Sequence, residues 1–267
     1  MLTFANAKIN LGLFLTEKRA DGYHNLQTVF YPIRIHDVVE LIDATETSML
    51  IKGMEIPGDA SDNICLKAFH TLQKDFNLPH QQIILLKKIP VGAGLGGGSA
   101  DAAFLIKLVN QKFNLGLTDE QMEAYARPLG ADCAFFIKNK PTYAFAKGDE
   151  FEELSLDLSA YYLVLVKPSV HVSTAQAYSK VNVKQPSSSL KDLIHLPLQD
   201  WQAHILNDFE PSVFAQYPQI DEIKTQLYQA GAKFALMSGS GSSVFGIFEK
   251  EVKLPALEKD NLVFYDI

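Results

Sequence analysis

Residues 90–103, "PVGAGLGGGSADAA", set the organisation of this chain, because five of the seven residues from 92 to 98 are glycine. The whole chain of 267 residues has 16 glycines. A run with strand character, "IILLKKIP" (83–90), precedes this loop, and an almost wholly apolar helical segment follows from about Ser99 to Asn110. A strand, a glycine turn and a helix N-terminus together cradle phosphate, since glycines let main-chain N–H groups approach an anion closely. The alternative is a flexible structural turn.

The loop matches neither of two common nucleotide motifs. No Gly-Lys-Ser/Thr follows it, so it is not a Walker A loop. The glycines are too dense for a dinucleotide fingerprint, and no βαβ unit with a later acidic residue is evident.

Outward from the loop, strands and helices alternate irregularly. Residues 8–15 alternate as a strand, Asp21-Gly22 predicts a turn, and Asp62 is a candidate helix N-cap. Further strands are expected at 24–35, 38–43, 141–146 and 161–168, and further helices after the capping box of Thr118 and Gln121 and over 219–230. This order favours an α+β fold over a doubly wound parallel sheet. We place a domain boundary near residue 155, giving domains 1–155 and 156–267.

The composition excludes several classes of protein. Lys plus Arg number 24 against 31 for Asp plus Glu, a net charge of −7, so a nucleic-acid or anionic-membrane binder is not expected. The two cysteines, Cys65 and Cys133, fit no metal spacing and are expected to be reduced thiols. The seven histidines show no metal spacing either. Without a visible signal peptide or an apolar run of membrane-spanning length, the expectation is a soluble cytoplasmic protein.

Two charged residues stand out as candidates for chemistry. Asp132, in "LGADCAFF" (129–136), is a carboxylate among apolar residues, either a helix N-cap after Gly130 or a base for a substrate hydroxyl. Lys8 lies on the polar face of a strand and is either a solvated lysine or the cation that stabilises phosphoryl oxygens.

Two other segments leave alternatives open. "SGSGSS" (238–243) is either a second main-chain platform near a phosphate or a plain hairpin turn. Tyr23 and His24 could stack a base or simply pack.

With these residues in view, "PVGAGLGGGSA" resembles the ATP-binding signature of the GHMP kinases, named for galactokinase, homoserine, mevalonate and phosphomevalonate kinases. The likeness runs from "AKINLGL" (7–13) to "SGSGSSVFGIF" (238–248), most of the chain. More narrowly, it is similar to those members that phosphorylate a cytidine diphosphate-linked methylerythritol in the non-mevalonate route to isoprenoids.

The resemblance implies a role for each matching residue. Lys8 and Asp132 ("LGAD") would be catalytic, and Asn10 would contact the substrate. From "RADGYHNLQTVF" (19–30) Tyr23 would stack on cytosine and His24 would hydrogen-bond to it, and from "VSTAQAY" (172–178) Tyr178 would stack as well. The residues implied for ATP binding are Asn63, from "DNICLKA" (62–68), together with Pro90, Gly92, Gly94, Leu95, Gly96, Gly97, Gly98 and Ser99.

The chain departs from the narrower pattern at two places. Cys133 and Ala134 follow "GAD" where an aliphatic residue and proline are usual, and Glu150 stands where a second glycine is common after Gly148. The first departure should slightly alter how the chain enters the following helix. The second affects details of the substrate-binding loop rather than the reaction.

The fold implied is a two-domain α+β fold, with ATP and substrate in the cleft between the domains. The implied reaction transfers the γ-phosphoryl of ATP, with Mg²⁺, directly to the tertiary hydroxyl of the methylerythritol unit, giving the 2-phosphate and ADP. Mg²⁺ would come with ATP and need few protein ligands. We expect a monomer or weak homodimer. The rivals are another GHMP kinase, for homoserine, mevalonate or a sugar, and a non-catalytic nucleotide-binding module.

Overall fold

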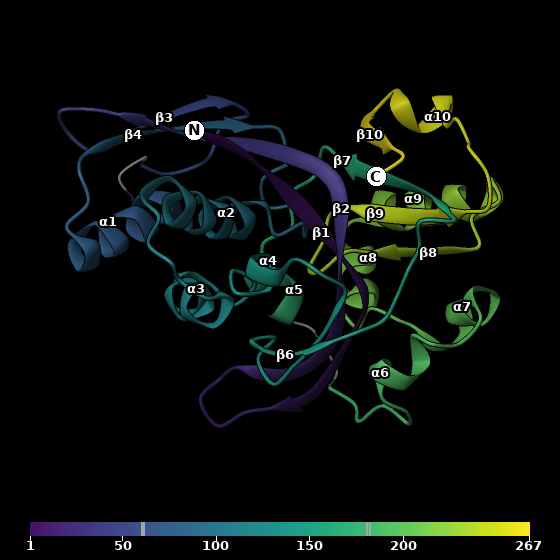
Figure 1. Ribbon diagram of the computed structural model, residues 1–267. Helices are drawn as coiled ribbons and strands as arrows, with labels where there is room; N and C mark the ends of the chain where they lie inside the picture. Colours follow the sequence, from purple (N-terminus) through teal and green to yellow (C-terminus); the bar gives the residue numbers. More distant parts are fainter. Residues whose placement is uncertain (60–61, 180, 182) are drawn as a thin grey trace. The chain divides into compact units, whose positions relative to one another are not determined.

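The chain opens with two long paired strands, β1 (Leu2–Lys18) and β2 (His24–Asp43), which Figure 1 shows side by side. The turn between them contains Asp21-Gly22, as predicted. The prediction of a separate strand at 38–43 was wrong, because that segment is the C-terminal end of β2. Neither Gly nor Pro stands between Ile35 and Val38, and Asp37, which resembles a strand breaker in sequence, is fully buried within β2.

The computed structural model describes residues 1–59, 62–179, 181 and 183–267. The chain divides into two compact units that are interleaved along the sequence. The first unit comprises residues 1–7, 35–91 and 96–140, and the second comprises residues 8–34, 92–95 and 141–267. The boundary near residue 155, a division of the sequence rather than of these units, stays a prediction.

In the first unit, helices pack on one face of a small sheet. The parallel strands β3 (Ser48–Gly53) and β4 (Gln81–Lys87) are joined through helix α1 (Ile64–Phe76), and β4 pairs with β2. Figure 1 shows α1 and α2 (Gly97–Phe113) lying together beneath β3 and β4. The remaining elements of this unit are α3 (Asp119–Ala126), η2 (Arg127–Leu129) and α4 (Phe135–Lys138).

Helix α2 is the core of the first unit. It is longer than predicted at both ends, and it contacts α1, α3 and α4. Nine of its residues are buried, among them Ala102, Ala103 and Leu105 at 0% exposure. The prediction that this almost wholly apolar helix is buried on several sides is confirmed.

Two predicted caps have different outcomes. Thr118 and Gln121 form the predicted capping box at the start of α3. The N-cap of α1 is Asn63 rather than Asp62, since the Asn63 side chain accepts the Cys65 N–H at 2.9 Å. Adjacent Asp and Asn are equivalent caps by type, so the sequence could not decide between them.

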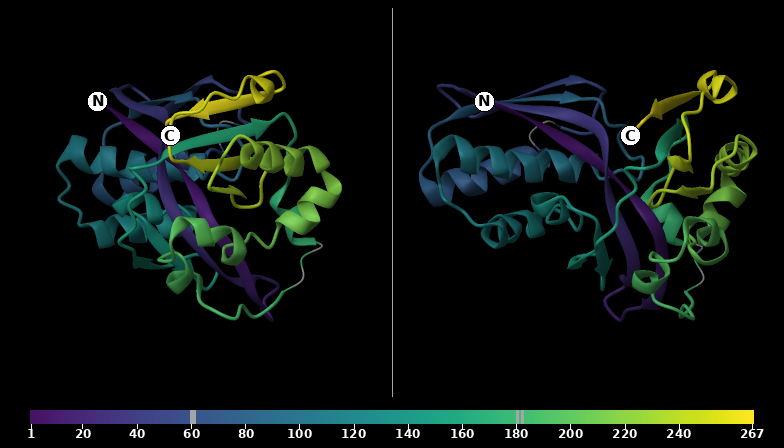
Figure 2. Two further views of the ribbon diagram at one scale, coloured as in Figure 1. Left: turned by 90° about the vertical axis from the view of Figure 1, so that its right-hand side faces the viewer. Right: turned by 45° about the vertical axis from the view of Figure 1, so that its right-hand side comes forward.

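The second unit continues β2 and adds a second sheet. β5 (Thr142–Phe145) pairs with β2 and with β6 (Glu150–Glu153). An antiparallel sheet has the order β10 (Asn261–Tyr265), β7 (Tyr162–Pro168), β9 (Val244–Phe248), β8 (Phe234–Met237). Helix α9 (Pro218–Gln229) packs on β7, β8 and β9, as the views in Figure 2 show.

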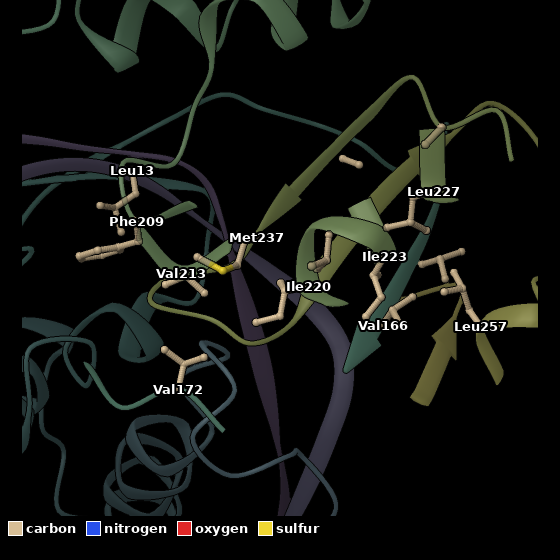
Figure 3. Close-up of a cluster of buried hydrophobic side chains, with 14 of the residues drawn as sticks. Leu13, Val166, Val172, Phe209, Val213, Ile220, Ile223, Leu227, Met237 and Leu257 are labelled. Carbon is tan, nitrogen blue, oxygen red and sulfur yellow. The ribbon is translucent and has the colours of Figure 1, made fainter. Parts of the chain in front are cut away.

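The other helices of this unit are α5 (Thr174–Ser179), α6 (Leu190–Leu193), η3 (Leu198–Asp200), α7 (Trp201–His204), α8 (Glu210–Gln216) and α10 (Pro255–Glu258). Figure 3 shows the core of this unit, where Ile220, Ile223 and Leu227 of α9 meet Val166 of β7 and Met237 of β8.

Two further findings bear on the composition argument. Cys65 and Cys133 are free thiols, as expected, and both are buried. Among the described helices, none has the length and apolar character needed to cross a membrane.

Candidate functional site

The glycine-rich loop leads into an uncapped helix N-terminus. Gly96, the N-cap of α2, has φ 67°, a left-handed conformation that favours glycine, and no described side chain caps the helix there. The helix ladder begins with the Ala100 N–H donating to the Gly96 carbonyl at 2.9 Å. The N–H groups of Gly97, Gly98 and Ser99 therefore have no acceptor within the helix and carry its partial positive charge. This end of α2 is suited to an anion.

A buried ionic cluster lies directly behind this helix end. Lys87 Nζ donates to Asp101 Oδ2 at 2.8 Å and to Asp37 Oδ2. The other oxygen of Asp37 accepts the main-chain N–H groups of Lys88 and Ile89. A Cβ on Gly97 would lie 2.9 Å from both Lys87 Nζ and Ile89 Cγ2, so a larger residue would require these side chains to shift. The cluster thus ties the end of β4 to the first turns of α2, bracketing the glycine-rich loop.

Burial and charge pairing have opposite effects on the carboxyl and the ammonium of the cluster. Burial raises the pKa of Asp101 well above its ordinary range, against the opposing effect of Lys87. The two carboxylates raise the pKa of Lys87 although burial opposes them. This cluster could not be predicted as a group, because its members are far apart in the chain. A signal existed, since Lys87 falls on the same alternating face of β4 as the buried Ile83 and Leu85.

Asp132 lies in the turn just before α4 and is half-buried. The alternative that it caps a helix is wrong, because the N-cap of α4 is Ala134. The turn packs on the first turn of α2, where a Cβ on Gly130 would lie 3.7 Å from Ser99 Oγ. Burial raises the pKa of the neighbouring Cys133 thiol to about 11, and its hydrogen bond with the Ser99 side chain lowers it only in part. The structure therefore brings the "LGAD" turn to the N-terminal end of α2.

Asn63 also belongs to this neighbourhood. A Cβ on Gly98 would lie 3.9 Å from Ile64 Cδ1, so the N-termini of α1 and α2 adjoin. Pro90 is buried and Val91 is exposed where the loop leaves β4.

In the second unit, Lys8 is held by two oxygens. Its Nζ donates to Asn10 Oδ1 at 2.6 Å and to the Gly94 carbonyl at 3.3 Å, and it lies 4.9 Å from the centre of the Phe30 ring. Lys8 is 3% exposed, so the alternative of a solvated strand lysine is wrong. Its main-chain N–H donates to the Leu95 carbonyl at 3.0 Å, which ties β1 to this part of the glycine-rich loop.

The serine- and glycine-rich turn between β8 and β9 supports the same group. Ser238 Oγ accepts the Asn10 main-chain N–H at 3.1 Å and donates to the Gly94 carbonyl at 2.8 Å. The segment is a hairpin turn, as one alternative held. Its backbone also lies against the glycine-rich loop, since a Cβ on Gly94 would be 2.0 Å from the Ser238 carbonyl oxygen.

Asn10 is 2% exposed, and both ends of its amide are engaged. Its Oδ1 accepts from Lys8, and its Nδ2 donates to Thr28 Oγ1 at 2.8 Å. Thr28 in turn donates to the Gly12 carbonyl at 2.6 Å. Through these contacts Asn10 holds the Lys8 ammonium in place.

The predicted aromatic residues separate into a pair and a single ring. His24 and Tyr178 lie with ring centres 5.1 Å apart at 32°, and Tyr178 meets Phe209 edge-on at 4.7 Å. Tyr23 is 64% exposed, and Lys147 Nζ lies 5.7 Å from its ring centre. The geometry brings His24 and Tyr178 together and leaves the Tyr23 ring on the surface.

Gly92 of the glycine-rich loop packs against the His171 ring. Gly92 has φ 63°, and a Cβ there would lie 2.4 Å from Cε1 of His171. Across the part of the chain that the structure describes, no group of three or more His, Cys, Asp or Glu residues could hold a metal ion.

Two family models match the chain. "GHMP kinases N terminal domain" matches residues 63–140, and "GHMP kinases C terminal" matches residues 189–259. The first match contains the glycine-rich loop and Asp132, and the second contains the turn with Ser238.

Curated relatives match along nearly the whole length. A Bacteroides fragilis protein named 4-diphosphocytidyl-2-C-methyl-D-erythritol kinase is 55% identical over 97% of this chain and 96% of its own. A protein of the same name from Bacteroides thetaiotaomicron is 50% identical over 99% and 98%.

Solved structures agree in fold. A crystal structure of 4-(cytidine 5'-diphospho)-2C-methyl-D-erythritol kinase superposes with a TM-score of 0.83 at 27% identity, covering 99% of this chain and 98% of that one. A mevalonate kinase shares the fold, with a TM-score of 0.75 at 14% identity over 99% and 98% of the two chains. The chain belongs to the GHMP kinases, in the family of the 4-diphosphocytidyl-2-C-methyl-D-erythritol kinases.

Proposed function

We propose that the chain transfers the γ-phosphoryl group of ATP to the 2-hydroxyl of 4-diphosphocytidyl-2-C-methyl-D-erythritol, giving the 2-phosphate and ADP. This step belongs to the non-mevalonate (methylerythritol phosphate) pathway of isoprenoid and terpenoid biosynthesis. The observation that supports the reaction type best is the packing of the Gly130–Cys133 turn on Ser99. It brings a carboxylate-bearing turn to an uncapped, glycine-rich helix N-terminus. Identities of 48–55% over 97–100% of the chain support the choice of substrate.

In the proposed mechanism, Asp132 accepts the proton of the acceptor hydroxyl. The acceptor oxygen forms a bond to the γ-phosphorus while the bond from that phosphorus to the β-phosphate oxygen breaks, and its electron pair leaves with ADP. The proton released from the hydroxyl goes to the Asp132 carboxylate. Such transfers depend mainly on position and charge stabilisation, which a fixed carboxylate and fixed main-chain donors supply.

The phosphates are assigned to the loop from Pro90 to Ser99, with the N–H groups of Gly97, Gly98 and Ser99 as donors. The glycines at 92, 94 and 96 have positive φ, which turns the backbone sharply at three places in this loop. Leu95 is buried and anchors it. Asn63 would lie toward the adenine, next to the start of α2.

Lys8 is assigned to stabilise negative charge on the transferring group. Its ammonium is buried and held by two oxygens, so it needs little reorganisation when charge develops. Mg²⁺, when bound, would neutralise charge on the β- and γ-phosphates, and the Ser99 hydroxyl is an oxygen ligand of the kind it accepts.

The cytidine end is assigned to the aromatic residues of the second unit. His24 would hydrogen-bond to the cytosine, and Tyr178 and Tyr23 would stack on it. The contact between His24 and Tyr178 supports a shared role for these two residues. Asn10, whose Oδ1 accepts from Lys8, would contact the acceptor beside it.

The experiment is a panel assay. The purified chain is given ATP and Mg²⁺ with the cytidine-linked methylerythritol, mevalonate, homoserine or galactose, and ADP release is followed. We expect turnover with the first acceptor alone. Turnover of mevalonate, homoserine or galactose without the cytidine-linked acceptor would overturn the substrate assignment and leave the family intact.

The role of Asp132 is tested separately with Asp132→Asn, which keeps the shape and removes the base. We expect kcat to fall by about 10²–10⁴-fold, the usual contribution of a general base, with ATP binding retained. Binding is measured by calorimetry and folding by the thermal midpoint. Wild-type kcat in this variant would remove Asp132 from the mechanism.

A further inference from the structure

Asn207, between α7 and α8, has a role that no motif predicts. Its side-chain Nδ2 donates to the carbonyl oxygens of Met237 and Gly239, both at 2.8 Å. Its Oδ1 accepts the Phe209 main-chain N–H at 3.0 Å, and the residue is 2% exposed. The two carbonyls stand on either side of Ser238, so one buried amide fixes the backbone of the turn at that residue.

The turn that Asn207 holds is the one that supports Lys8. Ser238 donates to the Gly94 carbonyl and accepts the Asn10 main-chain N–H. The Gly94 carbonyl and Asn10 Oδ1 are the two oxygens to which Lys8 Nζ donates. A shift of Ser238 would therefore move both acceptors of the Lys8 ammonium.

The same short segment also fixes the strand that carries Lys8. The Leu13 N–H donates to the Leu206 carbonyl and the Asp208 N–H donates to the Leu13 carbonyl, both at 2.9 Å. The Leu15 N–H donates to Asp208 Oδ2 at 2.7 Å. Residues 206–208 thus form hydrogen bonds with both the turn and strand β1.

We infer that Asn207 is a positioning residue, which sets the place of the Lys8 ammonium through Ser238 without touching substrate. The inference rests on the proposed function in that Lys8 must serve phosphoryl transfer. A merely structural Asn207 would hold the β8–β9 hairpin together with no link to Lys8. The two roles differ in what happens when Lys8 is already absent.

The experiment is a double-mutant cycle. Asn207→Asp keeps the size of the side chain but replaces the donor by an oxygen that faces two carbonyls. We expect kcat to fall on the order of tenfold, as for loss of a buried donor, while KM for the acceptor changes by less than about twofold. In a Lys8→Met background, measured under single-turnover conditions, Asn207→Asp should have no further effect, because its influence acts through Lys8.

Several outcomes would overturn the inference. These are an unchanged kcat in Asn207→Asp, an equal loss with and without Lys8, or a loss that appears wholly in KM. If Asn207→Asp does not fold, Asn207→Ser, which keeps one donor, is used in the same cycle. The matched control is Asn261→Asp, at the first residue of β10. It removes an amide donor to the Leu257 carbonyl and should keep wild-type kcat.

The cycle separates this inference from the proposed function. It needs only an acceptor that the wild-type chain phosphorylates, whichever member of the panel that is. Failure with the cytidine-linked acceptor overturns the substrate, and additive losses overturn the positioning role.

Discussion

Two buried lysines show how much single residues depend on partners that a sequence does not reveal. Lys8 and Lys87 both lie on strands and are 3% exposed. Alternation placed Lys8 on a polar face, which is correct, but a solvated face and a face lined by Asn10 and Gly94 have the same pattern in sequence. The sequence was enough to predict the strand face on which Lys8 lies. Contacts between side chains and residues far away in the chain could not be predicted from it.

Asp101 gives a test at this scale through the pH dependence of stability. Its Oδ1 has no hydrogen-bond partner in the described chain, a cost that is smaller for a neutral carboxyl than for a carboxylate. Burial raises its pKa well above the ordinary value, with Lys87 opposing and Asp37 adding to the rise. The folded chain therefore keeps this proton at a higher pH than the unfolded chain, and stability falls as pH rises from about 4 toward the folded pKa.

The side chain introduced by Asp101→Asn carries no charge at any pH. The variant should therefore lack that part of the decline in stability. We expect the free energy of unfolding of the variant, relative to wild type, to increase as the pH rises above about 4. Urea unfolding at several pH values measures it. Parallel curves for the two proteins would show that Asp101 does not titrate as described, because other raised carboxyls, such as Glu210, are present in both.

At the scale of elements, the glycine-rich loop was predicted well and the strands less well. Glycine density identified the loop and its helix, because few other structures need so many glycines together. The unbroken course of β2 was missed, since Asp37 is a poor strand residue whose buried partner, Lys87, is 50 residues away. Asn207 likewise has no local signal, because its acceptors are backbone carbonyls that any sequence supplies.

The glycines of the loop are not equivalent, which gives a stability test. Gly94 has φ 78° and no room for a Cβ, so Gly94→Ala should lose on the order of 1–3 kcal/mol. Gly98 lies within α2, and the nearest atom to a Cβ there is 3.9 Å away, so Gly98→Ala should gain about 1 kcal/mol through helix propensity. Urea unfolding compares them, and equal effects of the two substitutions would contradict these roles.

For the whole molecule, the two units share the strands β1 and β2, since residues 1–7 and 35–43 belong to one and 8–34 to the other. Each unit has its own core, built on α2 in the first and on α9 in the second. The α+β class followed from the irregular order of elements, but this interleaving did not, because a continuous strand gives no sign of where one core ends.

A substitution in one core should therefore affect both units. Ala103→Asp places an unpaired charge in the core of the first unit, at a cost on the order of 3–5 kcal/mol. The single tryptophan, Trp201, is buried in the second unit and reports on it. We expect the fluorescence and far-ultraviolet circular dichroism midpoints to fall together on heating.

The control for this prediction lies on the same helix. Gln111→Asp, at an exposed position of α2, should cost about 1 kcal/mol or less. A fluorescence midpoint that stays at the wild-type value in Ala103→Asp would show that the units unfold independently.

The unbroken course of β2 also limits how this chain can evolve. Thr28 supports the Asn10 amide and Asp37 binds the Lys87 ammonium, and both stand on one strand without a loop between them. Insertion or deletion of one residue between them would reverse the facing of every later side chain. Side chains at the exposed positions of this stretch can therefore vary between related chains, whereas a change in its length would displace Asp37 from Lys87.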